Sequence, residues 1–180
     1  YLSSHFNVGD DDAYIREALG ARERGFHGYK VHPRRKDNKS DPVADGVMLR
    51  KLRKALGDDF PIMHDPYNAY DLAGSLHSGK VADDIGLAWL ESPMPEGDEQ
   101  LADYMELTKT IKTPVMAPEF WGWLMKPRLY ETHDRRIRWL EAGATDMGRI
   151  DIQCGGLTPC IRLARYCAQH GYRLDFHLCN

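Results

Sequence analysis

The sequence predicts an α/β fold, a (β/α)8-type barrel domain that is incomplete in this chain, with about six to seven strand–helix units. Short apolar runs alternate strictly with segments of helical periodicity, which is typical of parallel strands joined by helical crossovers. The predicted strands end in polar residues: Lys30, Asp65, Glu91, Glu119, Asp151 and His177. These are separated by 35, 26, 28, 32 and 26 residues, and a barrel of ~250 residues allots ~31 to each unit. A doubly wound sheet would gather its site at one switch point instead of six successive strand ends, so the barrel is preferred.

The individual elements follow from local signals. The expected strands are residues 1–4, 28–32, 62–65, 87–91, 115–119, 146–151 and 173–177. Asp41-Pro42 and Thr158-Pro159 each predict a helix cap followed by proline at the first helical position, and a glycine ends each helix. A weaker helix is expected from about Asp71, because Gly74 and Gly79 interrupt it.

Length and charge exclude several classes of protein. The 180 residues suffice for one domain with a substantial core. A formal net charge of −3 gives no reason to expect nucleic acid or an anionic membrane as partner, and no apolar run approaches the ~20 residues of a membrane helix. Four cysteines without CxxC spacing predict reduced thiols and a cytoplasmic location.

The domain organisation is predicted to be partial. Residues 1–180 hold fewer strands than the eight that a closed barrel requires, so at least the last strand is expected to be absent. The chain opens on Tyr1 and stops just after His177, and both ends are expected to be cuts through a larger protein.

Three acidic residues, Asp65, Glu91 and Glu119, end successive strands. Two carboxylates ~4 Å apart repel by ~4 kcal/mol at an effective dielectric near 20, so three together require a cation. An all-oxygen ligand set favours Mg2+, with Mn2+ as the usual substitute. For any one of these acids alone, capping of a helix or pairing with an arginine is about equally probable.

The ordered set resembles the barrel domain of the enolase superfamily, in its mandelate racemase and muconate lactonizing enzyme-like subgroup. The motifs are Lys30-Val-His32, then the three acids, then Asp151 and His177 on the last two strands. The resemblance implies that a carboxylate substrate binds Mg2+ and that a base removes the proton beside its carboxylate. It also implies that Lys30 adds positive charge to the resulting ene-diolate.

His177 and Asp151 are the predicted proton-transfer pair. The resemblance implies that Asp151 orients the imidazole of His177, which fixes its tautomer and raises its basicity. Without the resemblance, a satisfied core histidine and a helix-capping aspartate would be favoured.

Two residues depart from the family pattern. His32 stands where the commoner motif has a second lysine, and is expected to act as a second acid/base or to bind substrate. Asn68 follows Asp65 by three residues instead of two, and is a candidate substrate-binding residue. His64 should point away from the face of Asp65 and is interpreted as structural.

Two further groups of charges follow predicted strands. The run Arg34-Arg35-Lys36 follows His32, and a solvated charge run is favoured over contact with an anionic or polyhydroxy substrate. Glu96 is expected to be a loop acid, with Glu91 as the ligand.

The predicted function is therefore a Mg2+-dependent lyase that dehydrates a sugar acid, an aldonate or aldarate. The alternatives are a racemase or epimerase of a 2-hydroxy acid, with His32 and His177 on opposite faces, and a non-catalytic binding relic. The resemblance also implies a homo-oligomer and an N-terminal capping domain, which is absent from this sequence. The expected partner is a small-molecule carboxylate.

Overall fold

The structure is a computed structural model that describes residues 1–37, 39–119, 133–152 and 156–177. The chain divides into two compact units. The first unit comprises Tyr1–Pro95 with Ile111–Thr113, and the second comprises Glu96–Thr110 with Pro114–Asn180.

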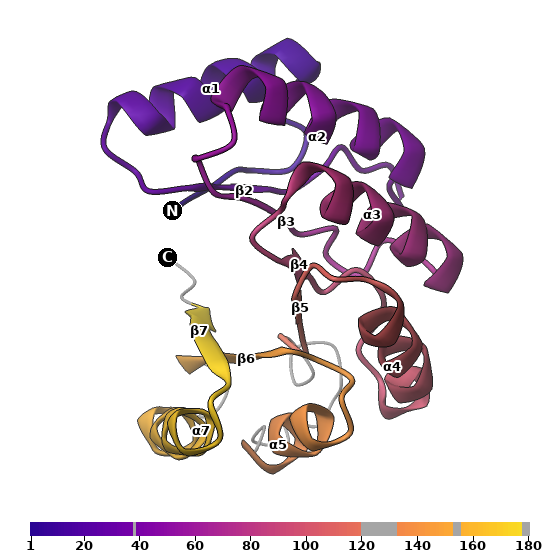
Figure 1. The fold of residues 1–180 in the computed structure, drawn as a ribbon, viewed down its shortest axis with the longest axis vertical. Helices are drawn as coiled ribbons and strands as arrows, with labels where there is room; N and C mark the ends of the chain where they lie inside the picture. The colour runs from indigo at the N-terminus through magenta and orange to yellow at the C-terminus, as the bar shows by residue number, and fades with distance from the viewer. Residues whose placement is uncertain (38, 120–132, 153–155, 178–180) are drawn as a thin grey trace. The chain divides into compact units, whose positions relative to one another are not determined.

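The first unit contains four parallel strands and three long helices (Figure 1). The strands are β1 (Leu2–Ser3), β2 (Tyr29–Val31), β3 (Ile62–His64) and β4 (Leu90–Glu91), and the helices are α1 (Asp11–Glu23), α2 (Pro42–Leu56) and α3 (Leu72–Ile85). Neighbours along the chain are neighbours in the sheet, with Ser3 opposite Lys30 and Lys30 opposite Met63. This order brings the carboxyl ends of four successive strands to one edge of the sheet.

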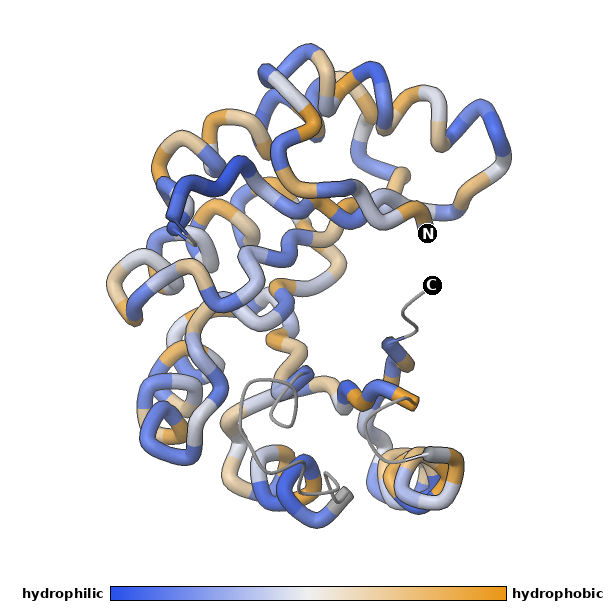
Figure 2. The backbone as a smooth tube through the Cα atoms, turned by 180° about the vertical axis from the view of Figure 1, so that it is seen from behind, coloured by the Kyte–Doolittle hydropathy of each residue, from blue (hydrophilic) through white to orange (hydrophobic). Residues whose placement is uncertain are grey.

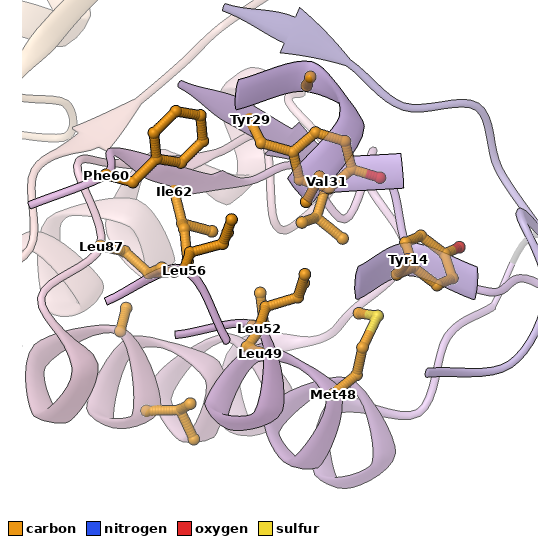
Figure 3. Packing of buried hydrophobic residues seen from close by; sticks show 14 residues of the cluster. Tyr14, Tyr29, Val31, Met48, Leu49, Leu52, Leu56, Phe60, Ile62 and Leu87 are labelled. Atoms are coloured by element: carbon orange, nitrogen blue, oxygen red, sulfur yellow. The ribbon is translucent and has the colours of Figure 1, made fainter. Parts of the chain in front are cut away.

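Helix α2 packs on the strands of the first unit through one apolar face. Its residues Met48, Leu49, Leu52 and Leu56 are buried in a cluster that includes Val31 and Ile62 of the strands (Figure 3). Fully burying each such side chain contributes about 1.5–3 kcal/mol. Figure 2 shows hydrophilic and hydrophobic residues interspersed along the helices of this unit, as expected for helices with one buried face.

Helix α3 begins where the sequence predicts it, directly after Asp71. It runs without interruption over 14 residues, and the carboxylate of Asp71 caps it by accepting a hydrogen bond from the Gly74 N–H at 2.8 Å. A Cβ atom at Gly79 would lie 2.6 Å from Cγ2 of Ile111. The predicted helix is confirmed, and the close approach of Ile111 at Gly79 provides packing that offsets the low helix propensity of glycine.

The second unit contains the strands β5 (Val115–Met116), β6 (Met147–Asp151) and β7 (Arg173–His177), which are parallel. Its helical elements are η1 (Asp98–Gln100), α4 (Leu101–Thr110), α5 (His133–Glu141) and α7 (Leu157–His170). The core of this unit joins α5, β6 and α7 through Leu140, Ile150, Cys160, Leu163 and Cys167.

Helix α7 begins earlier than predicted. Its first residue is Leu157 and its N-cap is Gly156, so Thr158 is not the cap and Pro159 is not the first helical residue. Proline is still accommodated, because the N–H groups of the first helical turn have no partner within the helix.

These observations confirm the predicted α/β class and the strict alternation of parallel strands and helices, which make the chain a partial (β/α) barrel. Among the described helices, none combines the length and the apolar character that crossing a membrane requires. The prediction about missing strands and a capping domain stays a prediction.

Candidate active site

The first unit brings a lysine, a histidine and two acids together at the carboxyl ends of its strands. The Nζ atom of Lys30, on β2, lies 3.0 Å from Oδ2 of Asp65 and 3.0 Å from Oε2 of Glu91. His32, just after β2, has its Nε2 atom 2.9 Å from the same Asp65 oxygen. Lys30 and His32 therefore share one face of the strand, as the alternation of side chains predicts.

Asp65 is ionised in this cluster although it is only 1% exposed. Burial raises the pKa of this carboxyl group. The charges and hydrogen bonds of Lys30 and His32 lower the pKa by a larger amount, so it lies below its usual range. The indole of Trp89 donates a hydrogen bond to Oε2 of Glu91 at 3.1 Å, which fixes the second carboxylate. Both acids are thus held in place by cationic or neutral donors.

Both ring nitrogens of His32 have partners. Its Nδ1 atom lies 2.7 Å from the carbonyl oxygen of Ser4, and its Nε2 atom faces Asp65. A carbonyl and a carboxylate are both acceptors, so this arrangement suits a ring that donates at both nitrogens. His32 is therefore anchored at both ends.

The loop after Asp65 is tied to the segment after Glu91. Tyr67, Asn68 and Ser92 all have φ values in the left-handed region, which is uncommon for residues other than glycine. The Asn68 N–H donates to the carbonyl of Ser92 at 2.7 Å, and the Tyr70 N–H donates to the carbonyl of Pro93 at 3.0 Å. These bonds link the chain beyond one buried acid to the chain beyond the other.

Asn68 is one of the residues that line a hollow of about 550 Å3, together with Lys39, Ser40, Tyr70 and Asp71. The lining of that hollow does not include Lys30, Asp65 or Glu91. Asn68 is therefore beside a polar hollow, and its part in substrate binding stays a prediction. His64 is fully buried with Nδ1 3.2 Å from Oγ of Ser78, and burial lowers its pKa to about 3, which agrees with a structural role.

The second unit contains a matching set of side chains on β6, on β7 and after β5. The register of the two strands places Arg149 opposite Asp175 and Asp151 opposite His177. Arg149 donates from Nη2 to Oε1 of Glu119 at 2.9 Å, and from Nη1 to Oδ2 of Asp175 at 2.5 Å. Glu119 and Arg149 are each only 1% exposed, so this is a buried ion pair.

His177 and Asp151 are hydrogen-bonded across the two strands. The Nδ1 atom of His177 lies 2.7 Å from Oδ2 of Asp151, which is fully buried. The Nε2 atom lies 3.4 Å from Oε1 of Glu119, and the imidazole is 19% exposed. The hydrogen bond at Nδ1 orients the ring, and part of the imidazole is accessible to solvent. Its role in proton transfer stays a prediction.

The sequence analysis missed three residues that hold Glu119. Arg149 lies two residues before Asp151 on the same strand face, so side-chain alternation was the signal that could have found it. Glu96 is a loop acid as predicted, but its carboxylate accepts a hydrogen bond from the Glu119 N–H at 2.9 Å. Arg136 of α5 donates to the backbone carbonyls of Glu119 and Arg149, which no local pattern indicates.

The donor set fits a hard divalent cation. Asp65, Glu91 and Glu119 are all buried and offer only oxygen ligands, the chemistry that Mg2+ prefers. In the first unit the ammonium group of Lys30 contacts one oxygen of each acid, so these two carboxylates are already arranged around a positive charge.

The proteins of similar sequence include two enzymes that are named for a sugar acid or a sugar-acid lactone. The L-talarate/galactarate dehydratase of Salmonella typhimurium is 25% identical over 167 residues, which are 92% of this chain and 38% of that protein. The D-galactarolactone cycloisomerase of Agrobacterium fabrum is 27% identical over 170 residues, 90% of this chain and 39% of that protein. The chain thus spans about two fifths of the length of these relatives.

A solved structure and a family model agree with this result. The D-glucarate dehydratase from Agrobacterium tumefaciens, complexed with magnesium, is 28% identical with a TM-score of 0.82, over 94% of this chain and 42% of that one. The family model described as Enolase C-terminal domain-like matches residues 13–180. The predicted resemblance is confirmed, and the chain belongs to the enolase C-terminal domain-like family.

Proposed function

We propose that this chain carries the metal-binding and proton-transfer residues of a Mg2+-dependent hydro-lyase that dehydrates a sugar acid. The observation that carries this proposal is the hydrogen bond of 2.7 Å between Asp151 and Nδ1 of His177, which leaves Nε2 as the nitrogen that can exchange a proton. The relatives named as dehydratases of galactarate, talarate and glucarate support the same reaction.

Asp65 and Glu91 of the first unit and Glu119 of the second are the proposed ligands of one Mg2+ ion, with Mn2+ as a substitute. When bound, the ion would act as a Lewis acid on the substrate carboxylate. Lys30, beside two of the three acids, adds a positive charge where the ene-diolate forms. His32 and Asn68 are proposed to contact the substrate.

His177 performs both proton transfers. Its Nε2 atom removes the proton from the carbon beside the carboxylate, and the electron pair of that C–H bond forms the ene-diolate. As the ene-diolate collapses, the bond to the β-hydroxyl breaks, and His177 returns the proton to the departing oxygen, which leaves as water. The enol product becomes a 2-keto-3-deoxy acid. Asp151 holds Nδ1–H throughout and stabilises the imidazolium.

Racemisation is not favoured. It needs a second acid/base on the opposite face of the substrate, and His32 is the only candidate that the sequence analysis offered for that role. Both nitrogens of His32 are engaged, by the Ser4 carbonyl and by Asp65. An imidazole whose two ring nitrogens both have close acceptors is better suited to binding a charged group than to transferring protons.

The compartment and the assembly are also proposals. Cys160 and Cys167 are free and buried, which agrees with reduced thiols and supports a cytoplasmic protein. Assembly into a homo-oligomer rests on the family resemblance, and light scattering on the full-length protein measures it.

A panel of sugar acids tests the reaction. The full-length protein with Mg2+ is incubated with aldonates and aldarates, and a keto-acid reagent follows the product. A dehydratase gives a keto acid with at least one member of the panel. Entry of solvent deuterium into recovered acid without any keto acid would support the racemase instead, and silence in both measurements would support a binding relic.

Metal binding is tested separately by Glu91→Gln, with Glu106→Gln as the matched control on an exposed part of α4. Because the loss of an outer-shell partner alone weakens metal sites by ~10–100-fold, removal of a ligand should weaken Mg2+ binding by at least ~10-fold in titration calorimetry. The control should bind as the wild type does. Unchanged affinity in Glu91→Gln would remove this residue from the ligand set.

A further inference from the structure

The guanidinium group of Arg35 contacts two aromatic rings in the first unit. Its guanidinium carbon is 4.9 Å from the centroid of the Phe6 ring and 5.1 Å from that of Tyr67. The two rings are themselves in edge contact at 5.5 Å. We refer to Phe6, Arg35 and Tyr67 as the arginine box.

The arginine box stands at the same strand ends as the candidate active site. Phe6 follows β1, Arg35 follows β2 and Tyr67 follows β3, so three successive loops contribute one residue each. The ring of His32 packs against Phe6 with 4.7 Å between centroids. The box is thereby joined, through His32, to the cluster of Lys30 and Asp65.

The basic residues on either side of Arg35 have different surroundings. Arg34 forms an ion pair with Asp11 at 2.8 Å and lies over the ring of Tyr14. Lys36 is exposed, and its backbone pairs with that of Lys39. The run of three positive charges is therefore not uniformly solvated, and the sequence interpretation needs correction at Arg35.

The box prepares Arg35 to bind an anion. Burial lowers the pKa of Arg35, while the electrostatic interactions with Tyr67 and Asp65 raise it, so the guanidinium is partly desolvated and lies within electrostatic reach of Asp65. It still carries its charge, because arginine does not deprotonate in proteins. Rings that contact a guanidinium hold it in one orientation, and its N–H donors form a rigid fork that matches a carboxylate.

We propose that Arg35 binds a second carboxylate of the substrate, at the end remote from the carbon that loses its proton. The substrate is then an aldarate, which has a carboxylate at each end, and not an aldonate, which has a hydroxymethyl group at one end. This inference rests on the proposed function. It assigns to Arg35 a specificity-determining contact that neither Arg34 nor Lys36 is placed to make.

Galactarate and galactonate provide a matched pair of substrates, because they differ only in that remote carboxylate. With the Mg2+-loaded full-length protein, kcat/KM should be at least ~10-fold higher for galactarate. A hydrogen bond to a charged group contributes about 1.5–3 kcal/mol, so Arg35→Gln should lower kcat/KM for galactarate by ~10–150-fold, mainly through KM. Its effect on galactonate should stay within ~3-fold, and the control Arg34→Gln should treat both substrates alike.

A binding measurement separates failure of this inference from failure of the proposed reaction. Adipate and 6-hydroxyhexanoate have the same carbon chain and cannot be dehydrated to a keto acid. By calorimetry, adipate should bind the Mg2+-loaded protein more tightly, and Arg35→Gln should abolish that preference. If neither galactarate nor galactonate reacts, the adipate preference still decides the role of Arg35. Equal affinity of the wild type for both ligands, or equal weakening of both by Arg35→Gln, would overturn the proposal.

Discussion

Each unit holds buried acidic side chains next to a cationic side chain, which is a lysine in the first unit and an arginine in the second. In the first, Lys30 lies between Asp65 and Glu91, with 3.0 Å to an oxygen of each. In the second, Arg149 donates to Glu119 and to Asp175. Lysine is a compact charge with rotatable donors, whereas arginine is a rigid planar fork. The donors of the first arrangement can therefore rotate between acceptors, whereas the second fixes its acids in one orientation.

The histidines of the two units differ in how closely acceptors approach their ring nitrogens. His32 has acceptors close to both ring nitrogens, at 2.7 and 2.9 Å. His177 has a close acceptor only at Nδ1, where Asp151 lies at 2.7 Å, and its contact with Glu119 through Nε2 is longer, at 3.4 Å. A base needs one nitrogen that can exchange its proton, so we propose that proton transfer belongs to His177 of the second unit and charge binding to the first.

The largest expected effect comes from removing each histidine in turn. General acid–base catalysis contributes ~10²–10⁴-fold, so His177→Asn should lower kcat by that factor. His32→Asn removes the contacts of the ring to Ser4, Asp65 and Phe6 but no proposed base, and should lower kcat/KM by only ~10-fold, the equivalent of one charge-assisted hydrogen bond. Steady-state assays of keto-acid formation measure both.

Exchange of the substrate α-proton with solvent deuterium provides an independent readout for these variants. Exchange should be lost in His177→Asn and retained in His32→Asn. The exposed His170 of α7 supplies the matched control, and His170→Asn should behave as the wild type. Full exchange in His177→Asn would contradict the assignment of the two histidines.

Removal of Lys30 and removal of Arg149 should affect the stability of the protein differently when Mg2+ is present. Removing one partner of a buried ion pair costs about 3–5 kcal/mol, so Arg149→Met should destabilise the protein by that amount, because Glu119 is only 1% exposed. Lys30→Met should cost a similar amount without metal and less with Mg2+, because a bound divalent ion compensates Asp65 and Glu91.

Urea unfolding with and without Mg2+ measures this difference, with Arg162→Met, an exposed position on α7, as the control. Mg2+ should restore less stability to Arg149→Met than to Lys30→Met, because the ion would compensate only Glu119 of the two acids that Arg149 contacts and would leave Asp175 without its cation. Equal rescue of both variants would show that lysine and arginine are interchangeable here.

Much of the fold follows from local signals in the sequence. Asp41 and Gly57 bound α2 as the capping rules predict, and β7 has the predicted limits, Arg173–His177. The start of α7 was predicted two residues too late, at Pro159 instead of Leu157. The regular course of α3 depends on the contact between Gly79 and Ile111, 32 residues apart, which helix propensities cannot include.

The candidate site was predictable where a residue ends a strand. Asp65 and Glu91 meet at Lys30, and Asp151 meets His177, because parallel strands align their carboxyl ends. The supports of Glu119 were not predictable, since Glu96 and Arg136 reach it from a loop and from another helix. The arginine box was missed because the ring contacts of Arg35 join three loops that lie apart in the sequence.

The smallest effect concerns a buried acid of the first unit that contacts a neutral donor instead of a cation. Asp45 is 2% exposed and accepts a hydrogen bond of 2.6 Å from the Tyr70 hydroxyl. Burial raises the pKa of Asp45 from 3.8 to about 6, although the hydrogen bond from Tyr70 opposes the change. The folded protein therefore holds this proton to a higher pH than the unfolded chain does.

Stability should consequently fall as the pH rises from about 4 to about 6, by an amount on the order of 2–3 kcal/mol for this one group. Asp45→Asn cannot titrate and should lack that loss. The free energy of unfolding of the variant, relative to that of the wild type, should therefore increase across this interval. Urea unfolding at pH 4 and pH 7 measures the gain, and the exposed Asp84→Asn is the control. A constant difference between Asp45→Asn and the wild type at both pH values would mean that Tyr70 holds Asp45 ionised. In that case a neutral hydroxyl would suffice to stabilise a buried carboxylate, and the lysine of the first unit and the arginine of the second would not be needed to keep their acids charged.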